Sequence, residues 1–229
     1  MNPKEPCMLL LNDIHISKDN IPDFSLNWNE ALSVCKRMSI QTIVLGGDLF
    51  FSRSSQTLDV LLAVHDALLA ARSMNMDVIL ANGNHDLVNL EAVRGYCHIF
   101  DQHDNVLVID EYHTLSNPEW CFSLHVIPYF PEDGSFRTKL DEVIQNELNI
   151  DKLNYLYIHE GINNALSHPA DRELPANIFG NFDKVFVGHY HNRCTVAPHI
   201  EYIGSARQHN FGEDEEKGYT ILYTDGTTE

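Results

Sequence analysis

The fold is decided by residues 7–15, which read CMLLLNDIH, an apolar run that ends in two side chains able to bind a metal ion, Asp13 and His15. A short continuous apolar run of this kind is typical of a strand buried on both faces of its sheet. The alternation of Asp13 and His15 places both side chains on one face of an extended segment. The run therefore predicts a buried strand with ligand groups at its C-terminal end.

Four more apolar runs along the chain end in the same way, each followed within a few residues by a carboxylate, amide or imidazole side chain. The five segments are 9–15, 43–48, 78–86, 155–159 and 185–191. Because ligands bind beyond the C-terminal ends of strands in α/β sheets, we expect these side chains to converge. Each motif alone is common by chance, and it is the ordered set that predicts a mixed oxygen and nitrogen metal site suited to Mn²⁺, iron or Zn²⁺.

Apolar runs alternate with amphipathic stretches over the whole chain, which indicates an α/β architecture. We expect strands at 7–12, 41–46, 77–81, 105–109, 120–127, 153–158, 184–187, 200–203 and 218–224, and helices at 27–38, 56–73 and 135–148. In the second helix, Leu58, Leu61, Leu62 and Leu69 mark the apolar stripe, and His65 on that stripe is expected to be a core histidine. No segment has the character of an interdomain linker, so we expect residues 1–229 to form one domain.

The composition is that of an ordinary globular protein with a strong acidic excess. Fifteen basic against 33 acidic residues give a net charge of −18, which opposes the binding of duplex DNA by this chain alone. No apolar run reaches the roughly 18–20 residues of a membrane-spanning helix, and no secretory signal is visible. The five cysteines are scattered, which favours reduced thiols. We therefore expect a cytoplasmic protein with no membrane association.

The ordered set of motifs resembles the signature of calcineurin-like metallophosphoesterases. Its members here are Asp13-x-His15, Gly47-Asp48, Gly83-Asn84-His85-Asp86, His159 and Gly188-His189-x-His191. The resemblance implies an α/β (α+β) fold, a four-layer sandwich of two packed mixed β-sheets flanked by helices, with the metal site at the C-terminal ends of the strands. It also implies a hydrolase that uses water activated between two cations.

The same resemblance assigns a role to each residue of the set. One divalent ion would be held by Asp13, His15 and His191, the other by Asn84, His159 and His189, with Asp48 shared between them. Mn²⁺ is the leading prediction, and Fe, Zn, Mg and Ni suit the same ligands. His85 would donate a hydrogen bond or proton to the phosphoryl or leaving oxygen, and Asp86 would orient His85.

A narrower resemblance, to SbcD-type nucleases of the double-strand-break-repair and phage recombination family, covers most of the chain. It rests on residues 47–55, 202–205, 211–213 and 217–218. It implies an exonuclease or endonuclease acting on DNA ends or single strands. It also implies an SbcC-type ATPase subunit as partner and the formation of a homodimer. Two departures stand out: Phe51 replaces a histidine that some members carry, and no capping or ATPase-docking domain is expected within residues 1–229.

Several other residues lie near the ligand motifs, and two other functions agree with parts of the sequence. Arg53, Arg193 and Arg207 lie in or near the motif loops, where an arginine contacts either substrate phosphate or a surface carboxylate. The acidic run 213–216 is expected to be a solvated loop, and His209 lies where it could approach the site. The rival functions are a stand-alone phosphatase or phosphodiesterase on small nucleotides or other phosphoesters, and a catalytically silent scaffold with the same fold.

Overall fold

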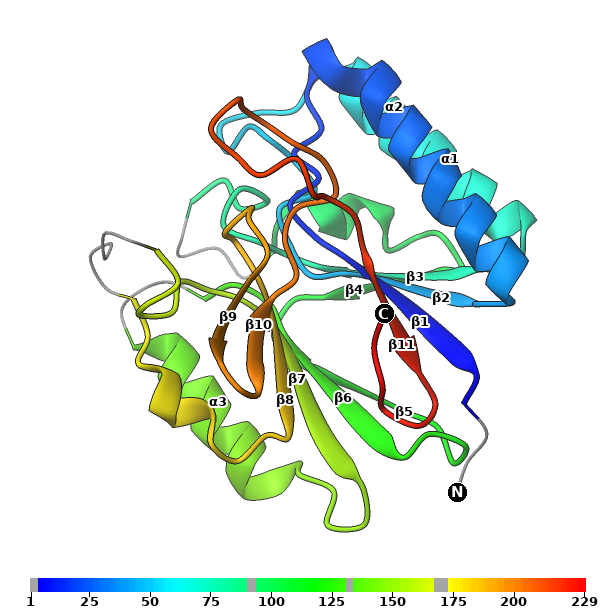
Figure 1. Cartoon of the computed structure of the whole chain (residues 1–229). Coiled ribbons are helices and arrows are strands. Elements are labelled where there is room, and N and C mark those ends of the chain that lie inside the picture. The colour runs from blue at the N-terminus through cyan, green and yellow to red at the C-terminus, as the bar shows by residue number, and fades with distance from the viewer. Residues whose placement is uncertain (1–3, 90–93, 131–133, 167–172) are drawn as a thin grey trace.

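Two β-sheets pack face to face in the computed structural model, which describes residues 4–89, 94–130, 134–166 and 173–229 (Figure 1). The five-stranded sheet has the order β11-β1-β2-β3-β4 and the six-stranded sheet the order β5-β6-β7-β8-β10-β9. The strands of the first sheet are β1 (Pro6–Leu11), β2 (Thr42–Leu45), β3 (Asp77–Ala81), β4 (Val106–Ile109) and β11 (Thr220–Tyr223). Those of the second are β5 (His113–Ser116), β6 (Phe122–Ile127), β7 (Leu153–His159), β8 (Lys184–Gly188), β9 (Cys194–Ala197) and β10 (Ile200–Tyr202).

Helices cover the outer faces of both sheets. α1 (Ile21–Met38) and α2 (Leu58–Ser73) lie on the five-stranded sheet, and α3 (Ser135–Asn146) lies on the six-stranded one (Figure 1). Each sheet contains parallel and antiparallel pairs, as in β1, which pairs with β2 in parallel and with β11 antiparallel. The predicted four-layer sandwich of two mixed sheets flanked by helices is therefore confirmed.

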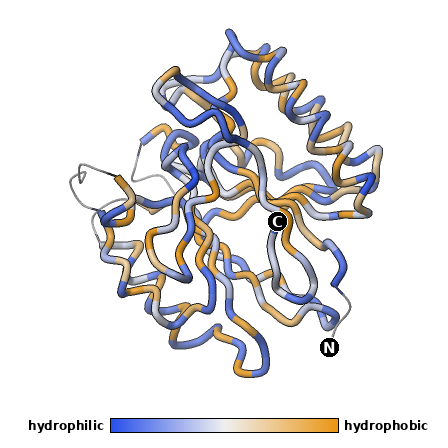
Figure 2. The backbone as a smooth tube through the Cα atoms, in the orientation of Figure 1, coloured by the Kyte–Doolittle hydropathy of each residue, from blue (hydrophilic) through white to orange (hydrophobic). Residues whose placement is uncertain are grey.

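Alternate residues of the central strands enter different cores. In β1, Met8 and Leu10 pack between the two sheets, whereas Leu9 and Leu11 pack beneath α1 and α2. In Figure 2 the hydrophobic colour accordingly concentrates along the strands. Burial on both faces explains why these strands are visible in the sequence as continuous apolar runs.

The elements differ from the predicted ones mainly at edges and ends. The edge strands β5 and β9 were missed because they are short and only half-buried. α1 begins at Ile21, six residues before the predicted start, with Pro22 in its first turn, where proline suits a helix. Three short 3₁₀ helices, Lys18–Asn20, Tyr96–Phe100 and Ala176–Phe179, were also missed.

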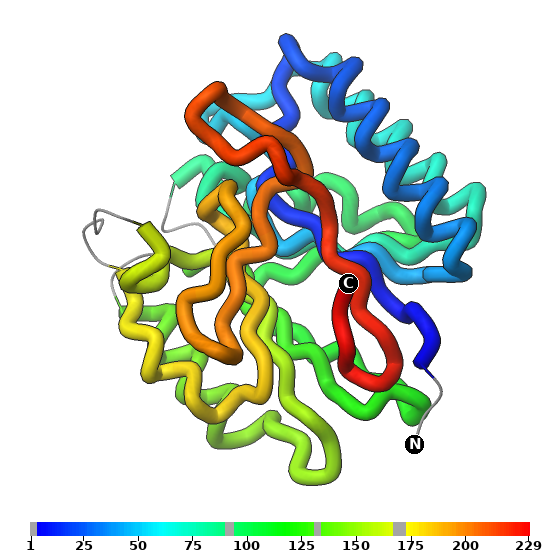
Figure 3. Tube along the Cα trace, in the orientation of Figure 1, coloured from blue at the N-terminus to red at the C-terminus, as the bar shows by residue number. Residues whose placement is uncertain are grey.

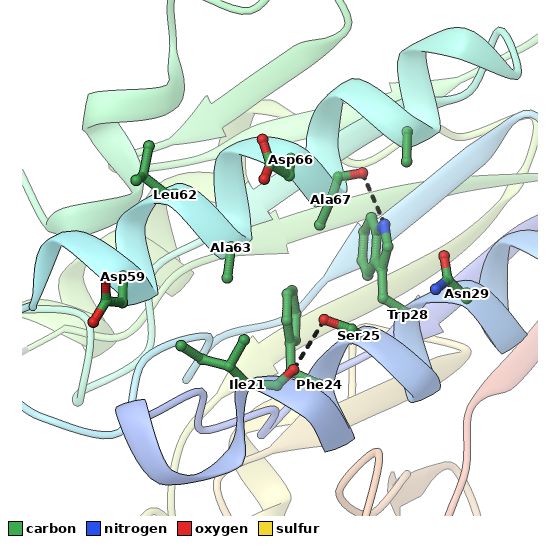
Figure 4. Close-up of a pocket in the computed structure, with 11 residues that line it drawn as sticks. Ile21, Phe24, Ser25, Trp28, Asn29, Asp59, Leu62, Ala63, Asp66 and Ala67 are labelled. Carbon is green, nitrogen blue, oxygen red and sulfur yellow. Dashed lines mark hydrogen bonds between the residues drawn. The ribbon is translucent and has the colours of Figure 1, made fainter.

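The buried face of α2 is not the predicted one. Leu58, Leu62 and Leu69 are exposed, Leu58 by 69%. The residues that pack inward are smaller on average, namely Val60, Val64, Ala67, Leu68 and Ala71. Small side chains let α2 approach its neighbours, and the Trp28 indole N–H of α1 donates a 2.8 Å hydrogen bond to the Ala67 carbonyl (Figure 4). His65 is half-buried at the side of this helix and bonds to His103 rather than lying in the core.

All five cysteines are free. None of the helices in the described ranges combines the length and the apolar character that a membrane crossing requires.

The hydroxyl of Tyr157 joins the two sheets where the ligand motifs begin. Tyr157 lies on β7, and its oxygen is 2.7 Å from both the Leu11 carbonyl and Asn12 Oδ1 at the end of β1. The ring passes over Gly46 so closely that a Cβ added there would overlap it. The close approach of the two sheets at this point therefore depends on a glycine on one and a tyrosine on the other.

We expect Tyr157→Phe to lower the free energy of unfolding by about 1–3 kcal/mol, because the buried Asn12 Oδ1 loses its donor, whereas the Leu11 carbonyl still accepts from the Gly46 N–H. Urea unfolding followed by circular dichroism measures this difference. Tyr219→Phe is the matched control, since no partner for that half-buried hydroxyl lies among the described residues, and it should change stability by under about 0.5 kcal/mol. Equal effects of the two substitutions would show that the hydroxyl does not tie the sheets together.

Candidate dimetal centre

The first group of predicted ligands comes together from the loops after β1 and β8. His15 Nε2 lies 3.1 Å from His191 Nε2, and Asp13 Oδ1 lies 3.9 and 4.0 Å from these nitrogens. Ligand atoms that share an ion about 2.1 Å away lie roughly 3–4 Å apart. Asp13, His15 and His191 are therefore spaced as ligands of one ion would be.

The second group comes from the loops after β3, β7 and β8. Asn84 Oδ1 lies 3.1 Å from both His159 Nε2 and His189 Nδ1. This amide oxygen and the two imidazole nitrogens thus face one point, beside the first group.

Asp48, which follows β2, lies between the two groups. Its Oδ2 is 3.5 Å from His15 Nε2 and 3.3 Å from His159 Nε2. Its other oxygen accepts a 2.8 Å hydrogen bond from the His85 backbone N–H, which fixes the carboxylate. A single carboxylate oxygen thus reaches ligands of both groups, which is the arrangement expected of a residue shared by two ions.

Four of the seven predicted ligands have a left-handed backbone conformation. The φ angles are 50° at Asp13, 49° at His15, 53° at Asp48 and 95° at His189. Such conformations cost non-glycine residues about 1–3 kcal/mol each and persist where the surrounding structure imposes them. Gly47 has a φ of 118°, and a Cβ added there would overlap His159 Nδ1. The turns after the strands therefore direct the predicted ligand side chains toward the centre, and their backbone conformations lower the stability of the fold.

The charges at the centre are almost fully buried. Burial and the nearby Asp48 raise the pKa of Asp13, whereas His159 and His15 outweigh burial and lower the pKa of Asp48. Burial lowers the pKa of His15 and of His189 to about 3, so both are neutral and able to coordinate at pH 7. Burial opposes the charged form of His159, but Asp48 and Asp13 raise its pKa to about 10. Two buried carboxylates facing imidazoles need positive charge between them, so the residues fit a pair of divalent cations.

His85 is partly exposed at the edge of this cluster. Its Nδ1 donates a 2.7 Å hydrogen bond to the Phe51 carbonyl, and its ring centre lies 4.8 Å from that of His15. Because Nδ1 is used in this way, Nε2 is the nitrogen that can face a substrate.

Asp86 does not orient His85, contrary to the prediction. The Asp86 carboxylate is fully buried and accepts hydrogen bonds from the backbone N–H groups of Gly83 (2.7 Å) and Phe50 (2.9 Å). Burial, with the nearby Asp48, raises the pKa of Asp86 to about 7. Adjacent side chains of this turn point in different directions, and Asp86 joins the loop after β2 to the loop after β3 instead.

The loop between β10 and β11 also reaches the centre. His209 Nε2 donates a 2.7 Å hydrogen bond to the Asp13 carbonyl, and its ring centre lies 4.7 Å from that of His191. Glu213 Oε1 accepts a 2.8 Å hydrogen bond from His191 Nδ1. Although burial opposes it, the bonds from His191, the His209 N–H and Lys217 lower the pKa of Glu213 to about 2.

This result corrects the prediction that residues 213–216 form a solvated loop. Residues 214–216 are exposed, but the Glu213 side chain is only 8% exposed. The only signal for Glu213 in the sequence was its place in the tail motif 211–213.

The three candidate arginines differ in their partners. Arg193 Nη2 lies 2.8 Å from Glu201 Oε1 and Arg207 Nη1 lies 3.5 Å from Asp23 Oδ2. Arg53 is exposed and forms no ion pair within the described ranges. Of the three, Arg53 is therefore the side chain left free to contact a substrate phosphate.

No protein-family model matches the chain. In sequence it is 25% identical over 206 residues to the SbcD subunit of the SbcCD nuclease of Staphylococcus saprophyticus, an alignment that covers 79% of this chain and 54% of the bacterial protein. It is 24% identical over 218 residues to phosphoesterase 244L of Invertebrate iridescent virus 6, covering 94% of this chain and 75% of the viral protein. The chain thus spans about half the length of the bacterial SbcD protein.

The fold matches that of a dimetal phosphatase from Danio rerio, with a TM-score of 0.59 and 12% identity over 96% of this chain and 93% of that one. Together the relatives and the fold support the predicted resemblance of the chain to metal-dependent phosphoesterases of the calcineurin-like superfamily. Within that superfamily its sequence is similar to an SbcD protein, which confirms the predicted resemblance.

We expect Asp48→Asn to lower the number of Mn²⁺ ions bound per chain from two to at most one. The substitution removes a shared negative charge, but it leaves an oxygen to accept the His85 N–H, so the fold should survive. Equilibrium dialysis with metal analysis gives the stoichiometry, and circular dichroism checks the fold. Two ions bound as tightly as in the wild type would contradict the bridging role of Asp48.

Proposed function

We propose that the chain hydrolyses phosphodiesters with two divalent cations, most simply Mn²⁺. Asp13, His15 and His191 hold one ion, Asn84, His159 and His189 hold the other, and Asp48 is shared. The observation that carries this proposal is the position of Asp48 Oδ2, within 3.5 Å of an imidazole nitrogen from each group. When bound, such a pair of cations supplies Lewis acidity and a water of lowered pKa for in-line displacement.

His85 is the residue we propose for proton transfer. Its Nδ1–H bond to the Phe51 carbonyl fixes the tautomer, so that Nε2 faces outward over the centre. From there it can hydrogen-bond the phosphoryl oxygen or protonate the leaving oxygen. Asp86 does not contact the substrate in this proposal. Its buried carboxylate instead positions the loops that carry His85 and Asp48.

We propose nucleic-acid ends or single strands as the substrate class, in keeping with the sequence similarity to a nuclease subunit. The loop after β2 supports this choice. Phe51 is 57% exposed beside His15 and His85, and Arg53 is unpaired within the described ranges. An exposed aromatic ring can stack a base and an arginine can bind a phosphate.

The backbone of this loop is fixed although its side chains are exposed. Phe51 N–H donates to the Ile16 carbonyl at 3.0 Å, and Tyr96 Oη donates to the Arg53 carbonyl at 3.0 Å. Because the backbone of this loop is already ordered, substrate binding costs less conformational entropy than it would on a mobile loop. A short single strand also places fewer phosphates near the net charge of −18 than a long duplex does.

An ATPase partner of SbcC type and a single catalytic domain are part of the same proposal. The partner rests on the similarity to an SbcD protein, one component of the SbcCD nuclease, and the single domain rests on the lack of a linker-like segment in the sequence. Co-purification with a tagged ATPase subunit from the same source would test the partnership.

The second candidate is hydrolysis of small phosphoesters without a partner. It is favoured by the acidic net charge and by a sequence alignment with the viral phosphoesterase that covers 94% of this chain. A silent scaffold is disfavoured because all seven predicted ligands are present and grouped in space.

The deciding experiment is a Mn²⁺-supplemented time course on end-labelled single- and double-stranded oligonucleotides, with Asp48→Asn as the contamination control. We expect the wild type alone to cleave, single strands faster than duplexes, and the product ladder to distinguish exonuclease from endonuclease action. Bis(p-nitrophenyl) phosphate is assayed in parallel. Hydrolysis of this diester without oligonucleotide cleavage would select the small-substrate function, and inactivity on both would overturn the hydrolase.

We expect His85→Asn to slow turnover by about 10²–10⁴-fold while both ions stay bound, because proton transfer is lost and the metal ligands are not. Single-turnover rates and metal analysis of the same preparation measure the two effects. An empty metal site in His85→Asn would mean that His85 is a ligand and that the division of roles is wrong.

A further inference from the structure

The four imidazoles of the centre are held in different ways. His15 Nδ1 donates to the Phe50 carbonyl at 3.3 Å, and His159 Nδ1 donates to the Gly46 carbonyl at 3.1 Å. His189 turns its Nδ1 to the centre itself. The Nδ1 of His191 points away from the centre and donates to a carboxylate, that of Glu213, rather than to a backbone carbonyl.

His191 also needs such support more than His15 or His159 does. Its side chain is 26% exposed, against 5% for His15 and 0% for His159. An imidazole at the open side of a site has few packed neighbours to keep its ring in place. A hydrogen bond from Nδ1 fixes both the ring and the tautomer, so that Nε2 faces the ion.

Glu213 is itself rigidly held. Lys217 Nζ lies 3.0 Å from its Oε2, the His209 N–H donates to the same oxygen at 3.0 Å, and Asn210 Nδ2 donates to Oε1 at 2.7 Å. Lys217 Nζ also donates to the His191 carbonyl at 2.7 Å. The carboxylate and the imidazole therefore belong to one hydrogen-bonded unit rather than to two loops that meet by chance.

The loop that carries this unit, residues 205–218, lies beside the loops that follow β1 and β2 in Figure 3. Besides Glu213 it supplies His209, which donates to the backbone of Asp13. The His209 ring also lies 4.9 Å from that of His15, so the loop contacts all three groups proposed for the first ion. The hydrogen bonds of Asn84 and His159, by contrast, run to each other, to His189 and to the Gly46 carbonyl.

We propose that Glu213 is a positioning residue that makes the two metal positions unequal. By holding His191 and increasing the basicity of its Nε2, it strengthens binding at the position of Asp13, His15 and His191 and leaves the other position nearly unchanged. The inference rests on the proposed two-metal function and adds to it an order of loading, which neither the ligand motifs nor the relatives specify.

The test is a titration of the metal-free protein with Mn²⁺, followed by electron paramagnetic resonance, which separates free ions, isolated bound ions and coupled pairs. In Glu213→Gln one ion of the two should bind about 10–100-fold more weakly, as found when such carboxylate partners of metal-bound histidines are removed. The position that Glu213 supports is the one expected to fill first, so the isolated-ion signal should then appear only at higher Mn²⁺ than in the wild type. Glu213→Asp, which withdraws the carboxylate by one methylene group, should lie between the two.

Glu215→Gln is the matched control, because it removes the same charge from an exposed residue of the same loop. It should titrate as the wild type does. Equal titrations of Glu213→Gln and wild type, equal weakening of both ions, or the same weakening in Glu215→Gln would each overturn the inference. A wild type that binds fewer than two ions would overturn the two-metal function itself, and the two failures are thus distinguishable without any substrate.

Discussion

The burial of three carboxylates at one point, where β1, β2 and β3 end, is the constraint on which the rest of the structure depends. Asp13, Asp48 and Asp86 are all almost inaccessible to solvent, and like charges at this depth destabilise a fold unless each is compensated. Asp86 is compensated by peptide N–H groups of two loops. Asp13 and Asp48 instead face imidazoles, and they retain the capacity to bind cations. The same region therefore contains one structural carboxylate and two that we propose as metal ligands.

The two sheets contribute different chemistry to this point. Of the proposed ligands, the five-stranded sheet supplies the oxygen groups of Asp13, Asp48 and Asn84 together with His15, whereas the six-stranded sheet supplies only imidazoles. The distance between the groups is consequently set by how the sheets pack. Tyr157, which spans from β7 to the end of β1, and the side chains of the inter-sheet core fix that packing. The geometry of the proposed site therefore depends on the packing of the core between the sheets.

The strands that are buried on both faces could be predicted from the sequence, whereas the edge strands and the contacts between loops could not. Strands buried on both faces produce continuous apolar runs, so β1, β2, β3, β7 and β8 were predictable, as was the convergence of the side chains at their C-terminal ends. The half-buried edge strands β5 and β9 leave no such pattern. The face of α2 was misjudged because three of its leucines, Leu58, Leu62 and Leu69, are exposed, whereas smaller residues such as Ala67 and Ala71 are buried. The contacts of Asp86 and Glu213 depend on loops that meet only in the folded chain, so they could not be predicted from the local sequence.

The wide separation of the ligands along the chain has a consequence for how the site is acquired. Asp13 meets the backbone of His189 across 176 residues and the ring of His209 across 196. Contacts of such long range are made late in folding, since loop closure must precede them. During synthesis the N-terminal carboxylates are complete long before their imidazole partners leave the ribosome. Cations would thus bind to an assembled scaffold rather than to a nascent chain, and their stabilisation of the folded protein would rise with the logarithm of their free concentration.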